Sequence, residues 1–203
     1  MEFLRSTALA RPGLYHALEA GRVLMLRLLV RVPLRQRNVR ELRLGQNLYQ
    51  DQAGHWQLTF SGSELKIGTR RGRANAYQVD LTDYCPNFLP LLEEFLATYR
   101  PRLPKAQAST HLFLTWHGTP FTQRSLAGEL GSIVARHTGQ RFYPHLLRTI
   151  WATEFLSKKE DFTTAATMLG DTLRTVMTTY YDIVHKDQHA KARDFLSETL
   201  REG

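Results

Sequence analysis

A histidine and an arginine lie one helical turn apart near the start of a predicted helix in the last third of the chain. His145 and Arg148 follow Pro144, a residue type that favours the first turn of a helix. At this spacing the imidazole and the guanidinium share one helix face, close to backbone N–H groups that attract anions. The pair suits a phosphate group. The alternative is a hydrogen-bonded core histidine beside a surface arginine.

Two adjacent tyrosines, Tyr180 and Tyr181, lie on another predicted helix further along the chain. A tyrosine oxygen can attack a phosphodiester as a covalent nucleophile, and nearby cations stabilise the charge of the pentacovalent phosphorane. Adjacent residues on a helix point about 100° apart, so only one of the two can face the cationic pair. For either tyrosine the alternative is a core or capping aromatic residue.

Other catalytic motifs receive no support from the sequence. Cys85 is the only cysteine, so a disulfide framework is excluded, and no cysteine pair or calcium-type acidic loop predicts a metal site. A glycine-rich phosphate loop is also missing, so ATP or NAD chemistry is not indicated. We expect neither a cofactor nor a metal.

The charge of the chain points to a polyanion as its partner. The 203 residues carry 27 Lys plus Arg against 19 Asp plus Glu, a net charge of +8. The first 45 residues hold nine arginines, three acids and no lysine, and arginine is suited to bidentate contact with phosphate. The alternative is that these arginines lie on the solvent-exposed faces of amphipathic helices. We expect nucleic acid ahead of a membrane surface, and a cytoplasmic, nucleoid-associated protein, because no signal peptide or membrane-spanning run is found.

The hydrophobic pattern predicts an α+β fold with more helix than strand. Apolar residues at helical spacing predict helices at 14–32, 36–44, 87–99, 122–137, 145–158, 161–169, 172–185 and 187–201, with Gly139 and Gly170 as stops. Alternation predicts strands at 56–61, 65–67 and 77–81, and another short strand at 111–115. A basic turn with Arg70, Arg71 and Arg73 lies at the tip of this antiparallel ribbon.

Four pieces of the sequence, in order, resemble the catalytic domain of tyrosine recombinases, the phage-integrase family. They are Pro33 to Arg43, which aligns without a gap to the family's first arginine box; Glu64-Leu65-Lys66 on a hairpin; His145 to Thr153, which aligns to the His-x-Leu-Arg box; and Leu169-Gly170-Asp171 followed nine residues later by Tyr180. The resemblance covers about residues 14 to 185. It implies the family's fold, mostly helical with a small three-stranded antiparallel sheet.

The resemblance also implies roles for individual residues. Tyr180 takes the place of the nucleophile, Arg35 and Arg148 would hold the phosphate oxygens, Lys66 would be the general acid, and His145 would assist at the phosphate. The implied activity is site-specific recombination or integration of DNA, as in mobile genetic elements, through a 3'-phosphotyrosyl intermediate without ATP or metal. The nine-residue offset favours Tyr180 over Tyr181.

Two residues depart from the family pattern. Asn38 replaces a common glutamate, and Asp171 stands where the family usually has His or Trp. An aspartate would repel phosphate unless it pairs with an arginine or turns away. We expect Asp171, a candidate site residue, to cap the helix that starts at Thr172, with activity retained but weakened.

The resemblance leaves alternatives at the level of the whole protein. A DNA-binding member of the fold with weak or no turnover is the main one; a type IB topoisomerase and a basic helical adaptor explain the ordered boxes less well. We expect one catalytic domain over 1–203, with a core at 14–185, a C-terminal helix at 186–201 and no N-terminal core-binding domain. Double-stranded DNA would be the partner, contacted by Arg37, Arg70, Arg71 and Arg73, and the C-terminal helix would link a tetramer. The alternative is a C-terminal helix that folds back on its own domain.

Overall fold

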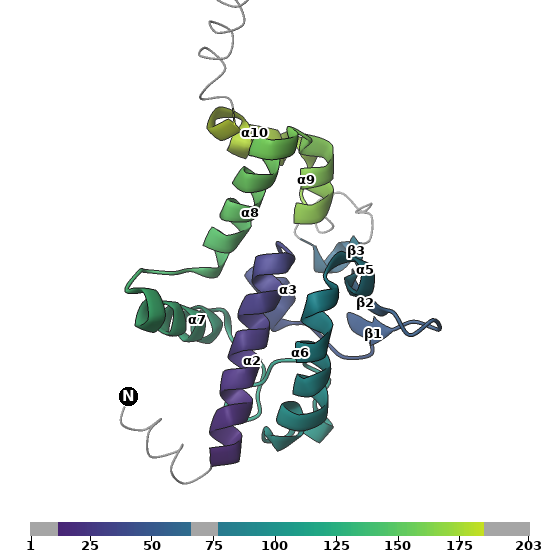
Figure 1. The fold of residues 1–203 in the computed structure, drawn as a ribbon, viewed down its shortest axis with the longest axis vertical. Helices are drawn as coiled ribbons and strands as arrows, with labels where there is room; N and C mark the ends of the chain where they lie inside the picture. Colours follow the sequence, from purple (N-terminus) through teal and green to yellow (C-terminus); the bar gives the residue numbers. More distant parts are fainter. Residues whose placement is uncertain (1–11, 66–76, 185–203) are drawn as a thin grey trace, which may run out of the picture.

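A long helix runs through the middle of the molecule, and the other elements pack around it (Figure 1). The computed structural model describes residues 12–65 and 77–184. The helices of four or more residues are α2 (Pro12–Arg31), α3 (Gln36–Arg40), α5 (Leu81–Tyr84), α6 (Leu89–Glu94) continued by a π-helical turn (Phe95–Tyr99), α7 (Gln123–Thr138), α8 (Pro144–Lys159), α9 (Phe162–Leu169) and α10 (Leu173–Val184). Short 3-10 turns lie at Gly62–Glu64, Pro86–Phe88, Arg100–Arg102 and Ala106–Ala108.

The central helix α2 is held by a continuous apolar stripe. Leu24, Leu28 and Val32 are at most 1% exposed, and they lie in the main hydrophobic core with the sheet and α6. Gly21 faces the ring of Phe95, where a Cβ atom would come within 3.2 Å of that ring. Pro33 follows the helix, as the sequence predicts.

Three antiparallel strands form the sheet in the order β1 (Leu48–Gln50), β2 (Trp56–Phe60) and β3 (Tyr77–Asp80). Leu58 pairs with Leu48 on one side and with Val79 on the other. The antiparallel ribbon is therefore confirmed, but its third strand is β1, which was not among the predicted strands. The predicted strand at 65–67 is not formed at Leu65, which follows a 3-10 turn in extended backbone; the rest of it, with the basic turn, lies outside the described residues.

Two other predictions differ from the structure. The helix expected at 36–44 ends at Arg40, because the chain turns there toward β1. The strand expected at 111–115 is reduced to isolated bridges at His111 and Leu114. The predicted inward residues Val39 and Leu42 are fully buried, so the pattern identified the core even where the element was wrong.

Helices α8, α9 and α10 gather at one end of the molecule (Figure 1). They enclose a second hydrophobic cluster of small and aliphatic side chains, together with Tyr180. Gly139 and Gly170 end α7 and α9 in left-handed backbone, as predicted. The fold is mostly helical with a three-stranded antiparallel sheet, which confirms the predicted class.

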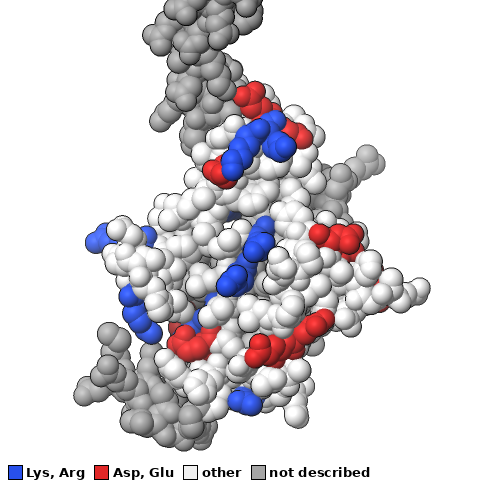
Figure 2. Space-filling view, in the orientation of Figure 1, with Lys and Arg blue, Asp and Glu red and all other residues white. Residues whose placement is uncertain are grey.

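On the face of the molecule drawn in Figure 2, positive charge lies in separate patches. Figure 2 shows Lys and Arg in a stripe across the middle of one face, and in a second group at one end of it. Exposed arginines at 27 and 31 of α2 line a groove on the molecular surface with Glu94. Among the described residues, no helix combines the length and the hydropathy that crossing a membrane requires.

Candidate active site

Arg35 joins two segments that are far apart in the sequence. It precedes α3 in extended backbone, and its Nη1 donates to the carbonyl oxygen of Gly170 at 3.0 Å. Its Nη2 lies 2.6 Å from Oδ1 of Asp171. The arginine box thus meets the turn between α9 and α10.

Arg148 is buried, with a side chain only 3% exposed. Its Nη1 donates to the carbonyl oxygen of Pro33 at 2.6 Å, and its Nη2 donates to Oδ2 of Asp171. Burial lowers the pKa of Arg148, and Arg35 adds to the lowering, whereas Asp171 and Tyr180 act in the opposite direction. A buried cation of this kind is stable only when it is paired and hydrogen-bonded.

Asp171 therefore bridges the two arginines, one carboxylate oxygen to each. The prediction that it caps α10 is wrong: the backbone N–H of Thr175 donates to Oγ1 of Thr172 instead. The backbone of Asp171 completes a Schellman turn, because its N–H donates to the carbonyl of Ala166 while Gly170 adopts a φ of 53°. Of the two conditions under which an aspartate at this position would not simply repel a phosphate, the structure shows the first: Asp171 is paired with arginine.

Tyr180 and Tyr181 lie on different faces of α10. Tyr180 is 5% exposed and belongs to the cluster between α8, α9 and α10, close enough to Arg148 to affect its pKa. Tyr181 is 45% exposed, and its ring lies 6.5 Å from that of Phe162. Of the two phenols, Tyr180 is the buried one, and it is the one that affects the pKa of Arg148.

His145 lies at the surface, in the first turn of α8. It is exposed, while Arg148 one turn later is buried. The alternative of a core histidine beside a surface arginine is therefore wrong, because the structure has the reverse arrangement.

Solved structures share this architecture, although no family model and no curated protein sequence matches the chain. The XerH site-specific recombinase bound to its difH substrate before cleavage aligns with a TM-score of 0.58 at 20% identity, over 79% of this chain and 42% of that one. XerH after cleavage, on a palindromic difH substrate, aligns with a TM-score of 0.61 at 18% identity, over 90% and 52%. The XerA recombinase aligns with a TM-score of 0.59 at 15% identity, over 90% and 63%.

The chain has the fold of a tyrosine recombinase catalytic domain. It spans about half the length of the recombinase chains that it matches.

The segment that leads to Lys66 is fixed by hydrogen bonds to Glu64. Asn47 donates to Oε1 of Glu64 at 2.9 Å, and the backbone N–H of Ser61 donates to Oε2 at 2.8 Å. Burial raises the pKa of Glu64, but these hydrogen bonds outweigh it and leave the pKa below its ordinary value. Asn38, the departure from the first box, donates to the backbone carbonyl of Glu64 at 3.3 Å. Asn38, in the first arginine box, therefore helps to hold the backbone of Glu64, two residues before Lys66.

Several predicted site residues are not brought to the arginine pair by the described structure. Lys66, Arg70, Arg71 and Arg73 lie outside the described residues. Arg37 is exposed on α3 and pairs with Glu41 at 2.9 Å. The roles of the carbonyl oxygens of Pro33 and Gly170 were not predictable from the sequence, because no side-chain pattern marks a backbone acceptor.

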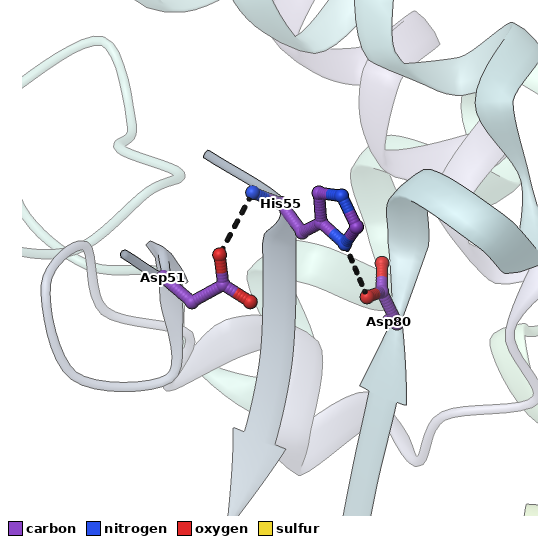
Figure 3. A group of neighbouring side chains, drawn as sticks. All are labelled: Asp51, His55 and Asp80. Atoms are coloured by element: carbon purple, nitrogen blue, oxygen red, sulfur yellow. Dashed lines mark hydrogen bonds and ion pairs between the residues drawn. The ribbon is translucent and has the colours of Figure 1, made fainter. Parts of the chain in front are cut away.

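A second group of possible ligands lies where β1 and β3 end and β2 begins (Figure 3). Nδ1 of His55 lies 3.2 Å from Oδ2 of Asp80, and the donor atoms of these residues and Asp51 all lie within 4.8 Å of one another. However, the amide of Gln57 donates to both carboxylates, at 3.0 Å and 2.9 Å. Asp80 also caps α5 through the N–H of Thr82. The group is therefore accounted for as a hydrogen-bond network that fastens the sheet to α5.

Proposed function

We propose that this chain is the catalytic domain of a site-specific DNA recombinase or integrase, which cleaves and rejoins strands through a 3'-phosphotyrosyl intermediate. One observation carries the proposal: Arg35 and Arg148, from separate segments, meet at Asp171, and the buried Tyr180 lies close enough to Arg148 to affect its pKa. Two guanidinium groups beside a phenol are the parts that phosphoryl transfer to tyrosine requires. The fold and the recombinase structures that share it support the same class of reaction.

In the first step the Oη atom of Tyr180 attacks phosphorus and the bond from phosphorus to the 5'-oxygen breaks. Arg35 and Arg148 stabilise the two non-bridging oxygens as charge builds up on the phosphorane. Lys66 donates a proton to the leaving 5'-oxygen, and His145 assists in taking the proton of the phenol. The products are a 3'-phosphotyrosyl bond and a free 5'-hydroxyl group.

In the second step a 5'-hydroxyl group from a partner strand attacks the same phosphorus and releases Tyr180. The energy of the phosphodiester is kept in the tyrosyl bond, so the exchange needs no ATP. The two arginines supply the positive charge that the transition state needs, so the proposed steps use no metal.

A second candidate function is a DNA-binding member of the same fold with weak or no turnover. The observation that favours it is the pairing of both arginines with Asp171. In this case the chain would bind duplex DNA through its basic surface and form no covalent product.

We further propose that the chain binds double-stranded DNA through Arg37 and through the basic turn of Arg70, Arg71 and Arg73. We also propose that copies of the chain assemble as a tetramer on that DNA. An apolar groove of about 380 Å³ beside α8, with Val30, Ile150 and Trp151 in its wall, supports an assembly. We assign it to the C-terminal segment 186–201 of a neighbouring copy, which carries apolar residues at helical spacing. Deleting that segment should abolish tetramers on DNA in sedimentation experiments while leaving monomer binding intact; tetramers that persist would contradict the assignment.

A nicked suicide substrate tests the proposed chemistry. Cleavage next to the nick releases a short strand, so the covalent adduct accumulates and is seen as a denaturant-stable shift. Tyr180→Phe should abolish the adduct, whereas Tyr181→Phe, the matched control on the exposed face, should leave it. An adduct that survives Tyr180→Phe would contradict the assignment of the nucleophile. Absence of any adduct with tight DNA binding would favour the second candidate.

A further inference from the structure

The anion between the two arginines is the protein's own carboxylate. Oδ1 of Asp171 lies 2.6 Å from Nη2 of Arg35, and Oδ2 accepts from Nη2 of Arg148. One oxygen for each guanidinium is also how two non-bridging oxygens of a phosphodiester would be shared between two arginines. The carboxylate thus makes the contacts that a phosphate at this position would need.

The exposure of the three side chains shows that a phosphate cannot simply be added beside the carboxylate. Arg148 is 3% exposed, and its other terminal nitrogen, Nη1, already donates to Pro33. Arg35 and Asp171 are 18% and 17% exposed, so they form the accessible face of the group. An incoming phosphate that is to reach Arg148 therefore meets Arg35 and the carboxylate of Asp171 first.

Charge adds to this obstacle. Two arginines alone would offer two positive charges, but with Asp171 between them the group carries a net charge of +1. At contact distance a carboxylate and a phosphate repel each other, and the repulsion is strong in a site that is largely closed to water. Both anions cannot occupy the space between the arginines together.

The arginines have anchors that do not depend on Asp171. Nη1 of Arg35 donates to the carbonyl of Gly170, and Nη1 of Arg148 donates to the carbonyl of Pro33. Both guanidinium groups can therefore keep their positions when the carboxylate leaves. Asp171 follows the left-handed Gly170 and precedes α10, so its side chain can turn without breaking a helix.

We propose that Asp171 is an internal substitute for the scissile phosphate, which closes the arginine pair in the DNA-free chain and is displaced when DNA binds. The inference rests on the proposed function, because it assumes that the arginine pair receives a DNA phosphate. It assigns Asp171 the role of an inhibitory residue that sets the affinity of the site, rather than that of a catalytic residue.

The test compares Asp171→Asn, in a Tyr180→Phe background, with the parent Tyr180→Phe chain in binding to a duplex that carries the recombination site. The neutral side chain no longer competes, so binding should tighten about tenfold or more. The phosphate reaches the two arginines in both complexes, so the slope of log K against log salt should stay the same. A slope steeper by about 0.9 would mean that the carboxylate stays in place in the parent complex, which would contradict displacement. Asp83→Asn is the matched control, since it makes the same change of residue type and removes one negative charge from an exposed residue on α5. It should change neither the affinity by more than about twofold nor the slope.

Unchanged or weaker binding by Asp171→Asn would overturn the proposal and make Asp171 a residue that positions the arginines. If Asp171→Asn does not fold, as judged by circular dichroism and thermal melting, Asp171→His gives the same comparison with the residue type usual in the family. The inference and the proposed function fail separately. Tighter binding without a covalent adduct from any variant with Tyr180 intact would refute the recombinase reaction alone. An adduct that forms equally fast with and without Asp171 would refute only the proposal that Asp171 takes the place of the phosphate.

Discussion

Arg148 is a buried cation whose two terminal nitrogens donate to two different segments of the chain. One donates to the carbonyl of Pro33 and the other to Asp171. The planar guanidinium fork is what permits both contacts at once. Lysine has the same charge but a single point of contact.

We expect Arg148→Lys to reduce the rate of covalent adduct formation by about 100-fold or more, because one donor to the reacting phosphate is lost. DNA affinity should fall by less than about tenfold, since most affinity comes from backbone contacts elsewhere. Single-turnover cleavage of the nicked substrate and a binding titration measure the two effects. Arg136→Lys, at an exposed position on α7, is the control and should retain the cleavage rate. Equal losses of rate and affinity in Arg148→Lys would show that Arg148 only positions DNA.

At the scale of elements, the turn between α9 and α10 carries the site. Gly170 has a φ of 53°, and its carbonyl oxygen accepts from Arg35. A Cβ atom there would meet Leu65 and Tyr77 only at ordinary van der Waals distances, 3.5 and 3.6 Å. The left-handed backbone, rather than crowding, is therefore why glycine is required.

Gly170→Ala should lower the free energy of unfolding by about 1–2 kcal/mol, the cost of a left-handed conformation for a residue with a side chain. Urea denaturation measures the loss. Gly139→Ala is the matched control at the exposed end of α7, with a φ of 71° and open space around it; it should cost a similar amount but leave cleavage unchanged. Cleavage that is as fast in Gly170→Ala as in the parent would show that this turn does not position Arg35 or Asp171.

The hydrogen-bond network of Asp51, Gln57 and Asp80, which joins the sheet to α5, predicts a loss of stability in acid. Asp51 has a pKa below its ordinary value, chiefly because the backbone N–H of His55 donates to it. Burial raises the pKa of Asp80, but hydrogen bonds from Gln57 and from the backbone of α5 outweigh it, so its pKa is also lowered. The stabilisation is complete above the unfolded pKa of about 3.9 and is lost as the pH falls through the lower folded values.

Urea unfolding between pH 6 and pH 2.5 should show this loss, and Asp80→Asn should make the dependence shallower. Asp83→Asn, an exposed acid on α5, is the control and should follow the parent. A parent-like curve in Asp80→Asn would contradict the role of this carboxylate.

The sequence predicted the helices well because each displays a full apolar stripe and several end at glycine. It missed β1, since three residues are too few to show alternation. It predicted that Arg35, Arg148 and Tyr180 act together, but only through the resemblance to a family. The pairing of Asp171 with both arginines could not be predicted from neighbouring residues, because the arginines are far away in the sequence. The preference of aspartate for a helix start is worth about 1 kcal/mol, and pairing with a buried arginine from another helix outweighs it.

At the scale of the whole molecule, the site lies where two hydrophobic clusters meet. The larger cluster holds α2 and the sheet, and the smaller one holds α8, α9 and α10. Arg35 reaches from the first to Gly170 and Asp171, while Arg148 reaches back from the second to Pro33. The cations that would bind the phosphate thus also tie the two parts together, which links the architecture to the proposed chemistry.

The most direct test of the central claim is to identify the residue bonded to DNA in the trapped adduct. Tryptic cleavage of the adduct after nuclease digestion yields the peptide of residues 175–186, which contains both tyrosines. Fragmentation by mass spectrometry should place the nucleotide mass on Tyr180. A modified Tyr181, or a nucleotide on any other residue, would contradict the assignment of Tyr180 as the nucleophile.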